Sequence, residues 1–142
     1  MVLTKISEVA SSIALGTLPE ERVGMIADGT AKAGWLVGNS TGTIAGCDSD
    51  GVDTFIGILD KRYDTDLDTI PAAAVVVDVI KPVSGRYYAV MVTDLNQSGA
   101  GIPLIFGATA GSLSVQAAVE GITVATTEKY DDGDTVAIVR WK

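Results

Sequence analysis

The sequence predicts an all-β fold, a small β-barrel or β-sandwich that follows an N-terminal arm or short helix. Two observations lead to this prediction. Short apolar and β-branched runs recur from Gly34 to the end of the chain, and turns rich in glycine or aspartate separate them. With 142 residues, the chain is large enough for one domain with an ordinary core. We expect strands near residues 34–38, 42–47, 53–60, 72–81, 86–93, 102–106, 112–116, 120–127 and 134–141.

The last third of the chain, residues 104–141, shows this pattern most clearly. An apolar run at residues 104–106 is followed by a glycine turn and a second strand at residues 113–115. Residues 121–126 are β-branched and apolar, residues 130–134 (YDDGD) form a turn, and residues 136–141 close the chain. This stretch contains no catalytic motif, and it predicts the closing half of a β-barrel or sandwich.

The same plan occurs once earlier, which suggests two pseudo-repeats. Residues 35–44 (WLVGNSTGTI) align without a gap with residues 104–113 (LIFGATAGSL), and residues 55–64 align with residues 122–131 after a two-residue slip. The alternative is that two hairpins with similar turns have similar sequences by chance. In either case each glycine pair permits a tight reversal between apolar strands, because glycine adopts positive φ angles without steric cost.

Between the two repeats lies the most apolar strand candidate. Residues 72–80 (AAAVVVDVI) form an apolar run that only Asp78 interrupts, which predicts a central strand covered on both faces. Residues 81–85 (KPVSG) then predict a turn that pairs this strand with residues 86–92 in a hairpin.

Residues 1–33 differ from the rest and are predicted to be an N-terminal arm, with the β domain over residues 34–142. Apolar residues recur at helical spacing and favour a short amphipathic helix over residues 5–15, namely Ile6, Val9, Ala10, Ile13 and Ala14. Such a segment would either bind a neighbouring subunit or plug its own barrel. It is a poor signal peptide, and no apolar run approaches the roughly 20 residues needed to span a bilayer, so we expect synthesis in the cytoplasm.

Composition excludes several function classes. The net charge of −8 argues against a nucleic-acid partner, because phosphate binding needs a basic surface. The absence of histidine removes the usual general base and the commonest metal ligand. Cys47 is the single cysteine, so the chain has neither an internal disulfide nor a thiolate zinc site, and we expect Cys47 to be a small, buried or half-buried apolar residue.

Three acidic stretches are candidate sites. Asp48, Asp50 and Asp53 surround Gly51 in a loop with some likeness to a calcium loop, but the terminal glutamate and the flanking helices of an EF-hand are missing. Residues 64–68 (DTDLD) and 131–134 (DDGD) follow Tyr63 and Tyr130 in matching places, and paired carboxylates can hydrolyse glycosides. Polar turns account for all three stretches, so we assign no catalytic, cofactor-binding or metal-binding residue and expect no enzyme and no cofactor.

The tryptophans and the lysines allow two further predictions, one about the core and one about carrier domains. Trp35 and Trp141 are the large aromatic anchors, and we expect them in the core rather than at an interface. Small duplicated carrier domains present a modified lysine at a hairpin tip, but residues 63–68 and 130–134 contain no lysine, so this class is excluded.

The motifs of the second half resemble those of the small capsid decoration (cement) proteins of tailed bacteriophages and related viruses. The matching segments are residues 33–37 (AGWLV), 108–113 (ATAGSL), 121–125 (GITVA) and 133–141 (GDTVAIVRW), whereas residues 72–101 are longer and more apolar than in that family. The resemblance implies a β-tulip-like fold and no catalysis. It further implies binding, as a homotrimer at local three-fold positions or in some relatives as a monomer, to the major capsid protein on the outside of an expanded icosahedral shell.

The expected function is therefore that of a structural virion protein that stabilises the expanded capsid and lies on the capsid exterior, with neither nucleic acid nor membrane as a partner. Many weak, repeated sites on a shell become collectively strong through multivalency. Two alternatives stay open: a ligand-binding or carbohydrate-binding β module, and another virion component such as a tail-tube or head-fibre protein.

Overall fold

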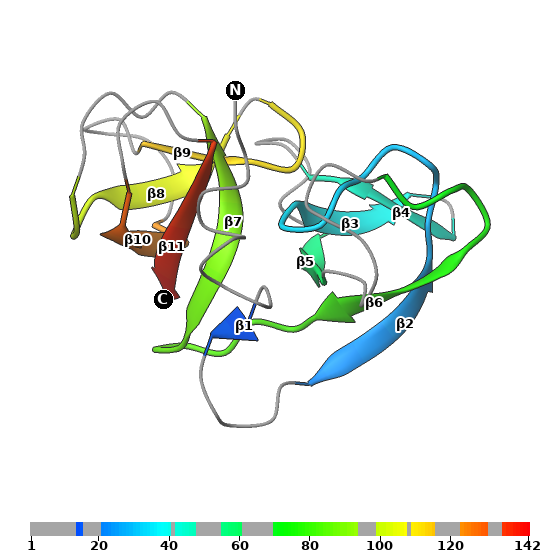
Figure 1. Cartoon of the computed structure of the whole chain (residues 1–142), viewed down its shortest axis with the longest axis horizontal. Helices are drawn as coiled ribbons and strands as arrows, with labels where there is room; N and C mark the ends of the chain where they lie inside the picture. Colours follow the sequence, from blue (N-terminus) through cyan, green and yellow to red (C-terminus); the bar gives the residue numbers. More distant parts are fainter. Residues whose placement is uncertain are drawn as a thin grey trace.

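A computed structural model describes residues 14–15, 21–40, 42–47, 55–60, 70–93, 99–107, 109–115, 123–130 and 135–142. Over these residues the chain forms eleven β-strands and no helix, which confirms the all-β prediction (Figure 1). The strands are β1 (Ala14–Leu15), β2 (Arg22–Ile26), β3 (Leu36–Ser40), β4 (Thr43–Gly46), β5 (Phe55–Leu59), β6 (Val76–Ile80), β7 (Tyr87–Thr93), β8 (Pro103–Phe106), β9 (Leu113–Val115), β10 (Ala125–Lys129) and β11 (Val136–Trp141).

The strands form two sheets, which we call the first lobe (β2 to β6) and the second lobe (β1 and β7 to β11). The second lobe has the order β1-β7-β11-β10-β8-β9, and a parallel pairing of β7 with β9 closes five of these strands into a small barrel. The first lobe has the order β2-β6-β5-β3-β4. A parallel bridge from Ala27 to Ile44 links the end of β2 to β4 in the corresponding place. The two lobes lie next to each other in Figure 1.

Both lobes have one topology, which confirms the predicted pseudo-repeat at the level of strand order. Strands β2, β6, β5, β3 and β4 neighbour one another in the first lobe as β7, β11, β10, β8 and β9 do in the second. The two ends of each series also meet in parallel, since β9 pairs with β7 and β4 forms a bridge at the end of β2. The aligned glycines Gly42 and Gly111 both have left-handed backbones, with φ angles of 89° and 86°. The strand registers beside these turns differ, because Ser40 pairs with Thr43 while Phe106 pairs with Leu113.

Each lobe has an apolar interior, and the two interiors lie on opposite sides of the β3–β5–β6 sheet. The interior of the first lobe consists of Ala27, Ala31, Val37, Ile44, Leu59, Val77 and Val79. The outward side of the same strands carries Leu36, Ile58 and Ile80, which are fully buried in the larger cluster that fills the second lobe. One face of the first lobe is therefore buried against the second lobe, and burial of this area stabilises the pair at about 25 cal/mol per Å² of apolar surface.

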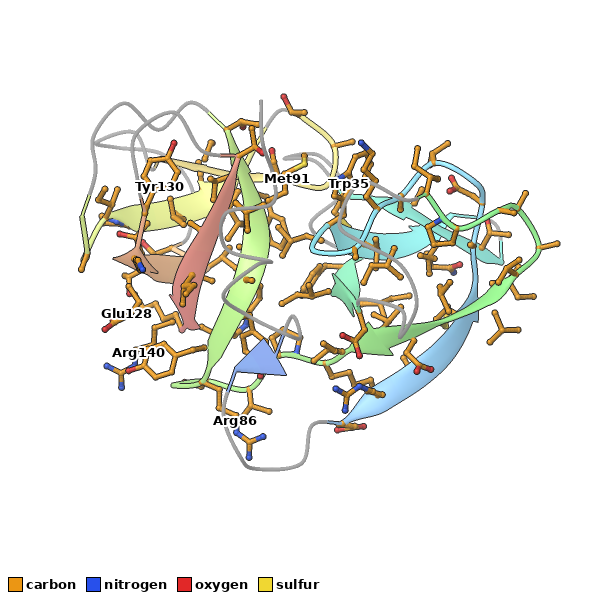
Figure 2. The ribbon with its side chains drawn as sticks, viewed as in Figure 1. Trp35, Arg86, Met91, Glu128, Tyr130 and Arg140 are labelled. Atoms are coloured by element: carbon orange, nitrogen blue, oxygen red, sulfur yellow. The ribbon has the colours of Figure 1, made fainter. Side chains whose placement is uncertain are left out.

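A glycine turn joins the lobes through their backbones. Cys47 N–H donates to the Leu36 carbonyl at 2.8 Å, as in a regular β3–β4 ladder. The backbone of Gly111 replaces the reciprocal bond: Leu36 N–H donates to the Gly111 carbonyl at 3.0 Å, and Gly111 N–H donates to the Cys47 carbonyl at 2.7 Å. A further bond runs from Met91 N–H to the Gly34 carbonyl at 2.9 Å, and Figure 2 labels Met91 and Trp35 on the two sides of this joint.

Trp35 packs over the same turn. A Cβ atom built on Gly111 would lie 2.6 Å from Cδ2 and Cε3 of the Trp35 ring, and one built on Gly46 would lie 2.9 Å from the Gly111 nitrogen. Real Cβ atoms do not approach neighbours this closely, so the joint requires glycine at both positions.

Two predictions about the middle of the chain were wrong. Strand β6 is central in its sheet, but its outer face is exposed at Val76 and Asp78, so it is not covered on both faces. Residues 81–85 do not form a hairpin, because β6 pairs with β2 and β5 whereas β7 pairs with β1, β9 and β11. These residues are the link between the lobes, and the Tyr88 hydroxyl accepts a 2.8 Å hydrogen bond from Val83 N–H there.

The strand limits also differ from the prediction in places. Residues 72–75 form a turn before β6, and β10 begins at Ala125, five residues later than expected. Ala14 and Leu15 pair with Tyr88 and Tyr87 as strand β1, so the predicted helix is wrong at these two residues. The rest of that helix lies outside the described residues. Within the predicted arm, β2 pairs along its whole length with β6 and belongs to the first lobe.

The joint can be tested with a matched pair of substitutions. Gly111→Ala and Gly42→Ala impose the same left-handed strain, about 1 kcal/mol, but nothing lies within 4 Å of a Cβ at Gly42. Because the methyl group of Gly111→Ala also overlaps Trp35, we expect a total loss of about 2–4 kcal/mol for it against about 1 kcal/mol for Gly42→Ala. Urea unfolding followed by circular dichroism measures both values, and equal losses would contradict the proposed role of the Gly111 turn.

Candidate interaction surface

The structure places some of the residues singled out from the sequence. Cys47 is buried at 3% exposure beside the joint. Trp141 is in the core, as predicted, where its ring stacks on Phe55 at 5.7 Å between centroids and meets Tyr88 edge-on at 6.3 Å. Trp35 is half-buried, packs against the interior cluster of the first lobe and also covers the Gly111 turn.

The acidic stretches fall almost wholly outside the described residues. This applies to Asp48, Asp50 and Asp53, to residues 63–68 and to residues 131–134, so the structure does not test the calcium-loop and glycosidase alternatives. Tyr130, which precedes the last of these stretches, is buried at 3% exposure. Among the residues described, no three Asp, Glu or Cys side chains gather where they could hold a metal ion. None of the described segments forms a helix long and apolar enough to cross a membrane.

The most distinctive surface of the described chain is apolar, and we call it the β2–β6 apolar face. Its large side chains are Ile26, which is 44% exposed, and Val76, which is 65% exposed. The exposed residues Ala72, Ala73 and Ala74 extend it along the turn before β6. Figure 1 shows that this turn and the adjoining end of β2 lie at the end of the molecule far from the second lobe.

Alternation along two paired strands produces this face. In β2 and β6, Val23, Met25, Val77 and Val79 point into the first lobe, so their neighbours point outward. Ile26 pairs directly with Val76, and Gly24 pairs with Asp78. An outward face of an antiparallel sheet is usually polar, so an exposed Ile–Val pair here requires a reason.

Charged residues border the same face at the other end of the two strands. Arg22 forms an ion pair with Asp60 at 2.9 Å, and Lys81 lies 3.5 Å from Glu21. Exposed pairs of this kind contribute at most about 1 kcal/mol each to stability. An apolar centre with a polar rim is the usual arrangement of a protein–protein contact surface.

The turn that carries part of this face has a strained backbone. Ala74 has a φ angle of 71°, and it is the one residue other than glycine with a positive φ in the described part of the chain. Hydrogen bonds hold it there: Ala74 N–H donates to the Ala27 carbonyl at 3.0 Å, and Ala27 N–H donates to the Val75 carbonyl at 2.8 Å. The bonds to Ala27 at the end of β2 therefore fix the turn and keep its small side chains at the surface.

Sequence reasoning missed this face because residues 75–77 are three consecutive valines, which hide the alternation of burial. The available signal was Gly24 and Asp78, which are poor residues for a strand buried on both faces.

Comparisons with known proteins do not add an assignment, since neither a protein-family model nor a curated protein matches the chain.

The strain at Ala74 can be measured. Ala74→Gly relieves a left-handed conformation, and we expect the free energy of unfolding to rise by up to about 1 kcal/mol. The control Ala73→Gly lies next to it without a positive φ, and we expect it to lower the free energy of unfolding by about 0.5–1 kcal/mol. Thermal and urea unfolding of the two variants should give opposite signs, and a destabilised Ala74→Gly protein would refute the strain.

Proposed function

We propose that this chain is a structural virion protein that binds the outer surface of an icosahedral viral head and stabilises the expanded capsid. The observation that carries the proposal is the β2–β6 apolar face, an exposed apolar surface on a body built from two lobes. The motif resemblance to capsid decoration proteins supports the major capsid protein as the class of partner.

The joint between the lobes suits this role. A protein that ties shell subunits together must resist deformation, and here two backbone hydrogen bonds through Gly111 and one through Met91 hold the lobes to each other. The buried face carrying Leu36, Ile58 and Ile80 adds apolar contact along the same joint. Binding to a shell through a stiff body loses little conformational entropy, which favours affinity.

The overall charge also supports the proposal. A net charge of −8 disfavours adhesion to the packaged nucleic acid, while contact through an apolar face does not depend on that charge.

We further propose that the chain acts as a homotrimer at local three-fold positions of the shell, so that several copies of the apolar face engage neighbouring capsid subunits together. Each contact can then be weak while the assembly is tight.

The apolar face supplies the test. We expect Val76→Lys to leave the free energy of unfolding within about 0.5 kcal/mol of its original value, because the side chain is mostly exposed. We expect the same variant to weaken binding to expanded, undecorated capsids at least tenfold. Val83→Lys is the control, since Val83 is 40% exposed but lies in the link between the lobes. Sedimentation of capsids with bound protein measures the affinity.

The outcome separates the proposal from its rivals. Loss of binding in Val76→Lys but not in Val83→Lys supports the apolar face, whereas equal binding of all three proteins would exclude it as the contact. If the original protein does not bind capsids and is absent from purified particles of its source, the virion role itself is wrong. Rings or rods of the isolated protein in electron micrographs would then favour a tail-tube or head-fibre component.

A further inference from the structure

A further feature of the first lobe is the side of β2 that faces away from β6, and we call this side, over residues 22–25, the β2 edge. Strand β2 is the last strand in the order β2-β6-β5-β3-β4. Among the described residues it meets another strand on this side only at the bridge from Ala27 to Ile44. Figure 1 shows β2 at the rim of the first lobe. The proposed capsid contact uses the outward face of the sheet and not this edge.

The pseudo-repeat relates the β2 edge to a definite part of the second lobe. Ala27 bridges to Ile44, Val92 pairs with Leu113, and Ile44 is aligned with Leu113 in the two repeats. Residues 22–27 of the first lobe therefore correspond to residues 87–92 of the second lobe.

In the second lobe a strand occupies the corresponding edge. Ala14 and Leu15 of β1 pair antiparallel with Tyr88 and Tyr87, and the β7–β9 pairing begins farther along the same strand at Val92. In the first lobe the bridge to β4 is present, but the described part of the chain places no strand beside the β2 edge. The first lobe is thus built like the second with one strand fewer.

The burial of the inward side chains reflects this difference. Tyr88 and Val90, next to β1 and β9, are both 0% exposed. Their counterparts Val23 and Met25 are only half-buried, although both pack against the interior of the first lobe. Because side chains on neighbouring strands cover one another, a strand at the β2 edge would complete the cover of Val23 and Met25.

The backbone of β2 is suited to pairing with a further strand. Ala27 N–H donates to the Val75 carbonyl at 2.8 Å, and Lys81 N–H donates to the Glu21 carbonyl at 2.9 Å, so the odd-numbered residues of β2 face β6. Residues of an antiparallel strand alternate in this respect, and Gly24 N–H and C=O therefore point to the β2 edge. Strand β2 has no proline, and its pairing with β6 has no bulge, which are two of the features that normally block an edge.

We propose that the β2 edge binds an extended segment of a partner protein as an additional antiparallel strand. The central residue of this segment would exchange both backbone hydrogen bonds with Gly24, and its two neighbours would lie opposite Val23 and Met25. Opposite residues point to the same side of a sheet, so these two neighbours should be apolar. Backbone hydrogen bonds then supply affinity, and the alternating side chains supply selectivity. The inference is independent of the proposed function, because any protein with such a segment would fit.

Amide hydrogen exchange measured by NMR tests the proposal on the unmodified protein. We expect the Gly24 amide to exchange at least tenfold faster than those of Val23 and Met25, which face β6. The probe is the capped peptide KTVTVTK, which places threonine opposite Gly24 and valine on either side. We expect it to slow exchange of the Gly24 amide at least tenfold. The control peptide KTVPVTK has the same charge but no central N–H, and we expect less than a twofold effect.

A matched pair of variants then locates the site. Gly24→Pro removes the N–H at the β2 edge and keeps the bonds to β6, and proline is tolerated on an edge strand in this position. Gly24→Ala keeps the N–H, and its methyl group would lie 3.5 Å from Cγ1 of Val76, an ordinary contact. We expect Gly24→Pro to weaken KTVTVTK binding at least tenfold and Gly24→Ala less than twofold, as measured by NMR titration.

The other outcomes each reject the proposal. A Gly24 amide that is already protected in dilute protein would show that the edge is filled, and protection that rises with protein concentration would make a second copy the occupant. Equal effects of the two peptides would show charge attraction alone. Binding that Gly24→Pro leaves unchanged would place the peptide elsewhere. If Gly24→Pro does not fold, the exchange rates of the unmodified protein with the two peptides decide the question.

Discussion

The arrangement of this molecule depends on one residue, Gly111, whose backbone N–H and C=O are inserted between two strands of the other lobe. Leu36 and Cys47 would exchange a second hydrogen bond directly in a regular ladder, but they exchange it through Gly111. Both backbone groups of Gly111 are therefore paired across the joint, and separating the lobes would replace these bonds by bonds to water, at a net cost of about 0.5–1.5 kcal/mol each. The equivalent turn at Gly42 does not pack in this way, because nothing lies within 4 Å of a Cβ atom built there. The two similar hairpins therefore differ in whether their glycine contacts the other lobe.

This difference between the two glycine turns determines which faces of the first lobe are buried against the second lobe and which stay exposed to solvent. In the first lobe, the outward side of β3 and β5 and the adjoining end of β6 are buried against the second lobe, and the part of β2 and β6 beyond that contact stays exposed. Val76 and Ile80 lie on the same strand, yet one is 65% exposed and the other is fully buried. An apolar face therefore remains at the far end of the first lobe as a direct consequence of how the lobes are joined.

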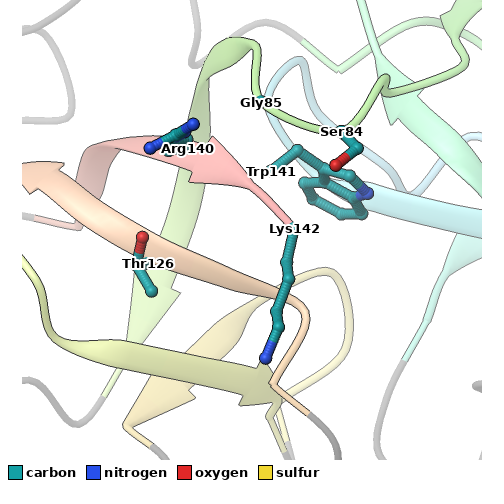
Figure 3. A pocket seen from close by; sticks show the side chains of 6 residues that line it. All are labelled: Ser84, Gly85, Thr126, Arg140, Trp141 and Lys142. Carbon is teal, nitrogen blue, oxygen red and sulfur yellow. The ribbon is translucent and has the colours of Figure 1, made fainter.

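The sequence predicted the strand content, the repeat and the order of most elements, because short apolar runs between glycine turns carry that information locally. It did not predict which of three consecutive valines, residues 75–77, face outward, since each of them suits either side of a sheet. The turn residues of segment 81–85 fit a hairpin and an inter-lobe link equally well. The surface hollow lined by Ser84, Gly85, Thr126, Arg140, Trp141 and Lys142 (Figure 3) had no signal in the sequence, because only the folded chain brings these distant residues to one place.

The β2–β6 apolar face lies at the end of the first lobe far from the joint, and this placement bears on the proposed function. An apolar face would contribute affinity that salt does not screen. Because backbone hydrogen bonds hold the lobes in a fixed relation, the body would present that face in one direction. A protein placed in many copies on a regular surface needs that property, because one wrong orientation would block its neighbours.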